Sequence, residues 1–238
     1  MLDLRFFYKI CIYKIYKYCI KWLKIIRKAE KMEKIKKVIL ENKRWFILAI
    51  VLIIFIAIAE DVWKKELFSF DSVIYQFMVN QRNGVLTAFM KTITQLGGAF
   101  VLISISILCM IFIKNKKYKA TIPINLVTIT IINVLLKDFF ERPRPEDNRL
   151  IQETGFSFPS GHSMASMAFY GYLIYLIYKN VKNKRLRYIL CAILLVLILL
   201  IGISRIYLGV HYASDVIAGL CLSVAYLIIC ISSGAYRA

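Results

Sequence analysis

The chain contains only two histidines, and both stand in polar segments that connect long apolar runs. His211 is followed four residues later by Asp215, so a helix that begins near His211 places the imidazole and the carboxylate on one face. A carboxylate that bonds one imidazole nitrogen fixes the tautomer and leaves the other nitrogen free to act as a nucleophile. His162 closes the Pro-Ser-Gly-His turn 159–162, directly before an apolar run. Backbone N–H groups at the start of a helix bind anions, so this turn suits a phosphate.

Basic residues share these connecting segments with the histidines. They are Lys137, Arg142, Arg144 and Arg205. The two Arg-Pro pairs in 142–145 favour an extended backbone, because proline disfavours helix in the residue before it. Fixed cations beside a histidine suit the binding of phosphoryl oxygens. The alternative is that they are ordinary anchors at the membrane surface. Arg142 in particular either helps to bind phosphate or pairs with Glu141 or Glu146.

Long apolar elements must position these segments. Six runs carry no Asp, Glu, Lys, Arg or His: 45–59, 92–113, 120–136, 163–178, 188–204 and 216–236. A helix that crosses a membrane needs about 20 mostly apolar residues. The chain is 60% hydrophobic and has a mean hydropathy of +0.65, whereas soluble domains contain about 45–50% apolar residues. We therefore predict an all-α fold, an integral membrane bundle of six transmembrane helices, and we exclude a water-soluble enzyme.

The charges lie mostly on one side of this predicted bundle. Residues 1–44, the two short connections at 114–119 and 179–187 and the C-terminal tail hold 24 of the 33 Lys and Arg and 4 of the 14 acids. By the positive-inside rule this side, with both termini, is cytoplasmic. The histidines and their cations then face outward. In a soluble protein a net charge of +19 would suggest nucleic acid, but in this chain it indicates anionic lipid head groups and no nucleic-acid partner.

The chain is predicted to have one membrane domain, 45–238, preceded by a basic extension, 1–44. Lysines recur at spacings of three and four between residues 14 and 31, which favours an amphipathic helix on the inner leaflet. The alternative is that translation begins at Met32. Residues 61–91 are too charged for a further span, and their apolar positions predict a helix along the outer interface. That helix either roofs an active site or caps the bundle.

Neither cysteines nor carboxylates predict a metal or cofactor. Four of the six cysteines lie inside apolar runs and two in the basic extension, so we interpret them as small hydrophobic residues. The chain has no Cys-x-x-Cys pair or Cys/His cluster, which argues against zinc. No cluster of carboxylates is available for Mg²⁺. We predict a site that works without metal.

The polar segments together form a three-part pattern within 137–215. It consists of Lys137 with Arg144-Pro145 seven residues later, then Pro159-Ser160-Gly161-His162, and then Ser204-Arg205 with His211 and Asp215. The pattern resembles the signature of the type 2 phosphatidic acid phosphatase family, a superfamily that includes soluble vanadium haloperoxidases. Every signature position matches. The six-run arrangement extends the resemblance to about 45–236, and the hydropathy excludes a soluble haloperoxidase.

The resemblance implies a mechanism. His211 attacks phosphorus and forms a phosphohistidine, Asp215 orients His211, and His162 protonates the leaving oxygen and then activates water. The phosphate-binding residues it implies are Lys137, Arg144, Ser160, Gly161 and Arg205. Fixed cations suit a loose phosphoryl-transfer transition state, in which positioning and electrostatics dominate.

The expected substrate is a lipid phosphate. A polyprenyl diphosphate such as undecaprenyl diphosphate is our first choice, with phosphatidylglycerophosphate or phosphatidic acid as alternatives. The competing class is a non-catalytic membrane transporter or scaffold. Transporters place ionisable groups near the membrane midplane, whereas the six apolar runs here contain none.

Overall fold

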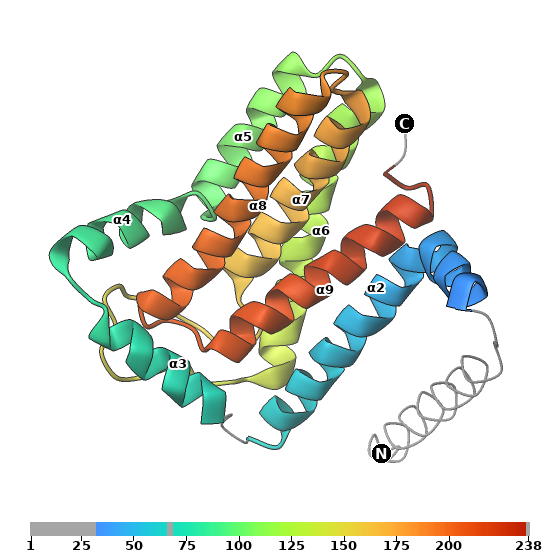
Figure 1. Ribbon diagram of the computed structural model, residues 1–238. Coiled ribbons are helices and arrows are strands. Elements are labelled where there is room, and N and C mark those ends of the chain that lie inside the picture. The colour runs from blue at the N-terminus through green and yellow to red at the C-terminus, as the bar shows by residue number, and fades with distance from the viewer. Residues whose placement is uncertain (1–31, 66–68, 237–238) are drawn as a thin grey trace. The chain divides into compact units, whose positions relative to one another are not determined.

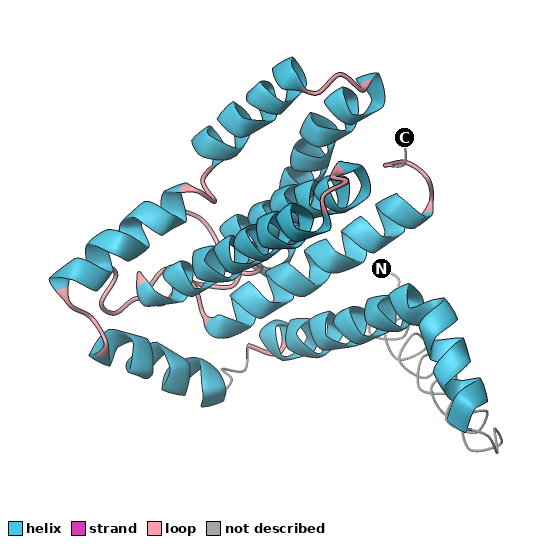
Figure 2. Ribbon diagram, turned by 45° about the horizontal axis from the view of Figure 1, so that its top comes forward, coloured by secondary structure: helices cyan, strands magenta, loops and turns pink. Residues whose placement is uncertain are grey.

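The computed structural model describes residues 32–65 and 69–236, and their regular structure is entirely helical (Figure 2). The helices are α2 (Met32–Trp63), α3 (Ser69–Asn80), α4 (Gly84–Gln95), α5 (Ala99–Phe112), α6 (Lys116–Phe140), α7 (Gly161–Asn180), α8 (Lys184–Tyr207) and α9 (Ala213–Ser232). The chain divides into two units, Met1–Ile47 and Leu48–Ala238, and the boundary falls within α2. The prediction of an all-α fold is confirmed for the described residues. The second unit holds every residue of the candidate site.

Helix α7 is the central element of the second unit and packs against α6, α8 and α9 (Figure 1). Small residues allow the close approach. A Cβ on Gly171 would lie 2.9 Å from a methyl carbon of Leu227 on α9, so only glycine fits there without movement. Polar groups also join the helices, since Asn125 of α6 donates to the carbonyl of Ala168 at 2.7 Å. Buried polar groups need such partners.

The outward faces of the peripheral helices are apolar. Phe100 and Phe112 on α5 are 84% and 77% exposed, and α6 and α8 also expose rows of Ile, Leu and Val. Exposed apolar surface on this scale marks a surface that contacts lipid. By length and composition, four described helices are candidate spans: the 42–63 part of α2, α6, α8 and α9. Counting the bent pair α4 and α5 as one span gives five, so the predicted number of six is not confirmed.

The predicted fourth span, 163–178, forms α7, which is not among these candidates. Its buried residues include Ser163, Ser166, Tyr170 and Tyr172. A helix surrounded by other helices need not be apolar all round, because its polar groups find partners inside the protein.

The predicted second span, 92–113, is interrupted. Helices α4 and α5 are bent by 48° around residues 96–98. A Cβ on Gly97 would lie 2.6 Å from a methyl carbon of Ile201 on α8, so the backbone passes very close to that helix. Gly98 has extended backbone and is the N-cap of α5. The Gly-Gly pair thus explains both the break and the close contact.

The segment 61–91, expected to hold a helix along the interface, contains the last residues of α2, all of α3 and most of α4. Helix α3 contacts the C-terminal part of the chain through α8 and α9, and α4 packs on α8. Arg82, between α3 and α4, donates to the Tyr207 carbonyl at 2.7 Å and to the Asn148 carbonyl at 2.7 Å. It therefore joins this segment to the end of α8 and to the 141–160 loop. The amphipathic helix predicted within 1–31 lies outside the described residues.

Candidate active site

The candidate residues meet where four helices end or begin. Lys137 lies in the last turn of α6 and Arg205 in the last turn of α8. His162 lies in the first turn of α7, and Asp215 in the first turn of α9. Alternating helix directions bring these four ends together, at the lower end of the bundle in Figure 1. Arg144 and His211 enter from the loops 141–160 and 208–212.

His211 is 1% exposed and contacts two candidate residues. Its Nδ1 lies 3.4 Å from a carboxylate oxygen of Asp215, and its Nε2 lies 3.2 Å from Nη1 of Arg144. A guanidinium only donates hydrogen bonds, so Nε2 must accept, and the ring proton lies on Nδ1 facing Asp215. Burial lowers the pKa of His211 to about 4, although the bond and charge of Asp215 act in the opposite direction. The ring is thus neutral at neutral pH, with the Nε2 lone pair directed toward the cations.

Asp215 is held by more partners than His211. It is completely buried and accepts hydrogen bonds from Ser157 at 3.0 Å and from the backbone N–H of Tyr212 at 2.9 Å. Its other oxygen pairs with Nη1 of Arg142 at 2.6 Å. Arg142 therefore pairs with Asp215 and with Asp71 of α3, and not with the neighbouring Glu141 or Glu146 considered from the sequence. The chain turns Arg142 inward, and the Ser157 N–H bonds its carbonyl at 2.8 Å.

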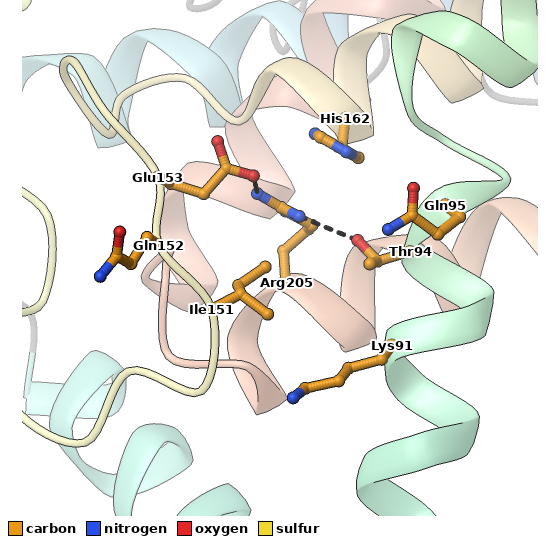
Figure 3. Close-up of a pocket in the computed structure, with 8 residues that line it drawn as sticks. All are labelled: Lys91, Thr94, Gln95, Ile151, Gln152, Glu153, His162 and Arg205. Carbon is orange, nitrogen blue, oxygen red and sulfur yellow. Dashed lines mark hydrogen bonds and ion pairs between the residues drawn. The ribbon is translucent and has the colours of Figure 1, made fainter.

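Arg205 is 1% exposed and lies at the centre of a polar pocket of about 290 Å³ (Figure 3). Nη1 donates to the Thr94 hydroxyl at 2.9 Å, and Nη2 forms an ion pair with Glu153. Nε has no hydrogen-bond partner among the described residues. A buried guanidinium donor without a partner is uncommon in native structures, and it distinguishes Arg205 from Arg142 and Arg144. Burial raises the pKa of Glu153, but the charge and hydrogen bond of Arg205 outweigh it, so the pKa lies below its usual range.

His162 lines two cavities of different character. One is the polar pocket around Arg205. The other has a volume of about 420 Å³ and is lined mainly by apolar residues of α5, α6 and α7. Burial, and then the charge of Arg205, lower the pKa of His162 to about 3. The ring is therefore neutral at neutral pH, between a polar and an apolar space.

The remaining candidates have structural contacts of their own. The Lys137 ammonium donates to the carbonyl of Phe156, and Arg144 donates to three backbone carbonyls, of Gly155, Thr154 and Val210. These bonds hold the 141–160 loop over the helix ends. Ser160 donates its N–H to the carbonyl of Asp215 at 3.1 Å, and its hydroxyl contacts that of Ser163 at 3.0 Å. Ser160 thus joins α7 to α9 where both begin.

The structure adds residues that the sequence pattern did not indicate as part of the site. They are Asp71, Thr94, Glu153, Ser157 and Ser214. Of these residues, only Asp71 could have been identified from its position in the sequence. It stands three residues before Ile74 and seven before Met78, on the apolar face of the predicted interface helix. A carboxylate on such a face requires a buried cationic partner.

A cation-rich site at one end of a helical bundle with lipid-facing surfaces defines a class, the integral-membrane enzymes that act on phosphate groups. Comparisons with known proteins agree. The sequence profile of the PAP2 superfamily matches residues 119–238. The chain is 32% identical over 174 residues to phosphatidylglycerophosphatase B of Bacillus subtilis, covering 71% of this chain and 86% of that protein.

Two solved structures are similar. The crystal structure of the first transmembrane PAP2-type phosphatidylglycerolphosphate phosphatase from Bacillus subtilis matches with a TM-score of 0.70 and 29% identity, covering 82% of this chain and 98% of that one. The crystal structure of Aquifex aeolicus LpxE matches with a TM-score of 0.56 and 28% identity, and the match covers 68% of this chain and 96% of that one. The chain belongs to the PAP2 superfamily, and it is a multi-pass membrane lipid phosphatase. The competing interpretation as a transporter or scaffold is therefore wrong.

Proposed function

We propose that the protein hydrolyses the phosphomonoester of phosphatidylglycerophosphate through a phosphohistidine on His211. The observation that carries the proposal is the position of His162 between the two cavities. A lipid phosphate has a charged end and a hydrocarbon end. With its phosphate at Arg205 and its hydrocarbon in the apolar cavity, the bond to be cleaved lies beside His162.

The reaction has two steps. Nε2 of His211 attacks phosphorus, the bond to the leaving oxygen breaks, and His162 passes to that oxygen a proton that the phosphate group of the substrate brings. His162 then takes a proton from water, whose oxygen attacks phosphorus, and the P–N bond breaks. The proton on His162 leaves with the released inorganic phosphate. Lys137, Arg144 and Arg205 hold the phosphoryl oxygens, assisted by the backbone N–H of Gly161. The Ser160 N–H, expected from the sequence to assist as well, is bonded to the Asp215 carbonyl instead. These donors balance the charge of the transition state without a metal ion.

Substrate access requires two contacts to open. Glu153 occupies Nη2 of Arg205, and Arg144 occupies Nε2 of His211. His211 is not among the residues that line the polar pocket. An incoming phosphate that takes hydrogen bonds from both guanidinium groups would replace Glu153 at Arg205 and free the Nε2 lone pair.

The names of the similar proteins favour phosphatidylglycerophosphate over our first choice from the sequence. Undecaprenyl diphosphate stays the second candidate, because Lys91 lines the polar pocket with Arg205. A further cation there suits a substrate with a second phosphate, which both lipids have and phosphatidic acid lacks.

A phosphate-release assay on purified protein in detergent tests the substrate. The panel contains phosphatidylglycerophosphate, undecaprenyl diphosphate, phosphatidic acid and a soluble sugar phosphate, each with and without EDTA. We expect the highest kcat/KM for phosphatidylglycerophosphate, no activity on the sugar phosphate and no effect of EDTA. A preference for undecaprenyl diphosphate would reverse the order of the two candidates, and loss of activity with EDTA that Mg²⁺ restores would refute a metal-free site.

We further propose that both termini are cytoplasmic and that the site faces outward, because the basic connections lie opposite the site. The exposed residues Glu146 and Asn183 stand at opposite ends of the bundle, beside the site and at the start of α8. In a background without the six native cysteines, Glu146→Cys should react with an impermeant thiol reagent in intact cells, and Asn183→Cys should not. The reverse pattern would invert the orientation.

A further inference from the structure

A second carboxylate lies behind the Asp215–His211 pair. Asp71 of α3 is 1% exposed and forms an ion pair with Nη2 of Arg142 at 3.0 Å. Nη1 of the same guanidinium pairs with Asp215 at 2.6 Å. Arg142 is itself only 6% exposed, and it lies over the ring of Tyr212, 4.3 Å from the ring centre. One buried cation therefore bridges two buried carboxylates.

The charges of this cluster do not cancel. Asp71, Arg142 and Asp215 together carry one negative charge, the same as a lone carboxylate. Without Asp71, the charge of Arg142 would neutralise that of Asp215, and the pair would present no net charge to His211. In a buried site with a low effective dielectric constant, one unit of charge has a large effect on a neighbouring group.

The other groups that face His211 make this charge important. Arg144 reaches it from the 141–160 loop and Arg205 lies on α8, and both disfavour a positive charge on His211. His162 of α7 is neutral at neutral pH. Asp215 of α9 is the only anion that contacts the ring among the described residues. A histidine phosphorylated on Nε2 with its proton on Nδ1 carries a positively charged ring. Its stability therefore depends on the negative charge of Asp215 and the residues paired with it.

We propose that Asp71 is a positioning residue of the phosphatase reaction, which acts through Arg142 to keep a net negative charge beside His211 as phosphohistidine forms. The proposal rests on the assignment of His211 as the nucleophile. It also gives α3 a part in the reaction, since α3 supplies the second carboxylate.

Asp71 has a structural contact that must be separated from this role. It accepts hydrogen bonds from the backbone N–H of Ser214 at 2.8 Å and from the Ser214 hydroxyl at 2.5 Å, in the first turn of α9. Ser214→Ala removes the hydroxyl and leaves all charges in place. Asp71→Asn keeps an acceptor for the N–H and removes the charge. The exposed loop residue Asp147 offers a matched control, Asp147→Asn.

The test measures kcat, KM and the inhibition constants of inorganic phosphate and orthovanadate. Vanadate adopts five-coordinate geometry with a bond to the nucleophile, so its affinity follows transition-state stabilisation. We expect Asp71→Asn to lower kcat and to weaken inhibition by vanadate, each by about 10- to 100-fold. Effects of this size are usual for residues that orient a functional group without contacting the substrate. KM and phosphate inhibition should change little. Ser214→Ala should lower kcat by less than about fivefold. Asp147→Asn should leave kcat unchanged.

A double variant gives the sharpest result. Asp71→Asn with Arg142→Gln restores the single negative charge at Asp215, so it should be more active than Asp71→Asn alone. If Asp71→Asn does not fold, the double variant is compared with the wild type, because both carry a single negative charge in this cluster. A folded double variant with kcat within about tenfold of wild type supports the proposal, and a larger loss overturns it. The proposal also fails if Asp71→Asn loses kcat and phosphate affinity together, or if Ser214→Ala is equally damaging.

The failure of the proposed function would look different. A wild-type enzyme that forms no phosphohistidine contradicts the assignment of His211 as nucleophile. A wild-type enzyme that forms it, with undiminished formation in Asp71→Asn, contradicts only the role of Asp71.

Discussion

The two histidines of the site have contrasting surroundings. His211 is 1% exposed, and both ring nitrogens have a partner. Behind it lies a cluster in which Asp215, Arg142 and Asp71 pair with one another. His162 instead lines two cavities, beside an arginine with an unpartnered Nε. A nucleophile needs a fixed direction and a constant charge environment, whereas a general acid must reach both the leaving oxygen and water.

The largest loss of activity is expected when His211 is replaced. His211→Ala should lower kcat by about 10⁴-fold or more, because removing the nucleophile of a covalent mechanism removes the reaction path itself. No phosphoenzyme should form with any leaving group. Acid-labile, alkali-stable ³²P label on the protein measures phosphohistidine, and its persistence in this variant would show that another residue is the nucleophile.

His162, which lines two cavities, should behave differently. His162→Ala should lower kcat by about 10²–10⁴-fold for a lipid substrate, the usual contribution of general acid–base catalysis. The loss should be smaller for p-nitrophenyl phosphate, whose leaving group needs no proton, and phosphoenzyme should accumulate because the base for water attack is missing. Equal losses for both substrates would contradict the division of roles.

Arg205 belongs to the surroundings of His162, and its guanidinium is proposed to bind phosphate directly. Arg205→Lys keeps the charge but removes the planar set of donors, so it should lower kcat/KM by about 10²-fold. Arg185→Lys, at the opposite end of α8 and exposed, is the matched control. If the two variants have equal activity, the phosphate does not bind through the guanidinium.

The pH dependence of kcat/KM tests the source of the proton that His162 passes to the leaving oxygen. The pKa of His162, about 3, and that of His211, about 4, leave both rings neutral at neutral pH. The neutral nucleophile is then available above pH 4, and the proton for the leaving oxygen must arrive with the substrate. A phosphomonoester has a second pKa of about 6, so kcat/KM should fall about tenfold per pH unit above roughly pH 7. A constant kcat/KM up to pH 9 would contradict this.

The smallest effect is expected at Glu153, which competes with phosphate for Arg205. Glu153→Gln should strengthen inhibition by inorganic phosphate by about two- to fivefold, since partly exposed ion pairs contribute at most about 1 kcal/mol. Glu146→Gln, on the same loop and exposed, is the control. Weaker inhibition in Glu153→Gln would mean that the carboxylate helps to hold the loop around the phosphate instead of competing with it.

The helices and the grouping of the candidate residues were predictable from local pattern. Lys137, His162, Arg205 and Asp215 all flank apolar runs, and runs that alternate in direction must bring such flanks to one end. The break at Gly97 was not predictable, because an apolar run with two glycines reads as a continuous span. The glycine pair permits it, and at the break the backbone passes close to Ile201, about a hundred residues away in the chain.

The sequence by itself determined an all-helical membrane protein whose histidines and cations share one end, because hydropathy and residue spacing act over short distances along the chain. Only the tertiary structure decided which charges pair. Arg142 has acidic neighbours in the sequence but binds Asp71 and Asp215, each more than 70 residues away. Arg205 likewise binds Glu153. These partners depend on the packing of α3 and the 141–160 loop against the helix ends, and buried charges take whichever opposite charge the packing encloses with them.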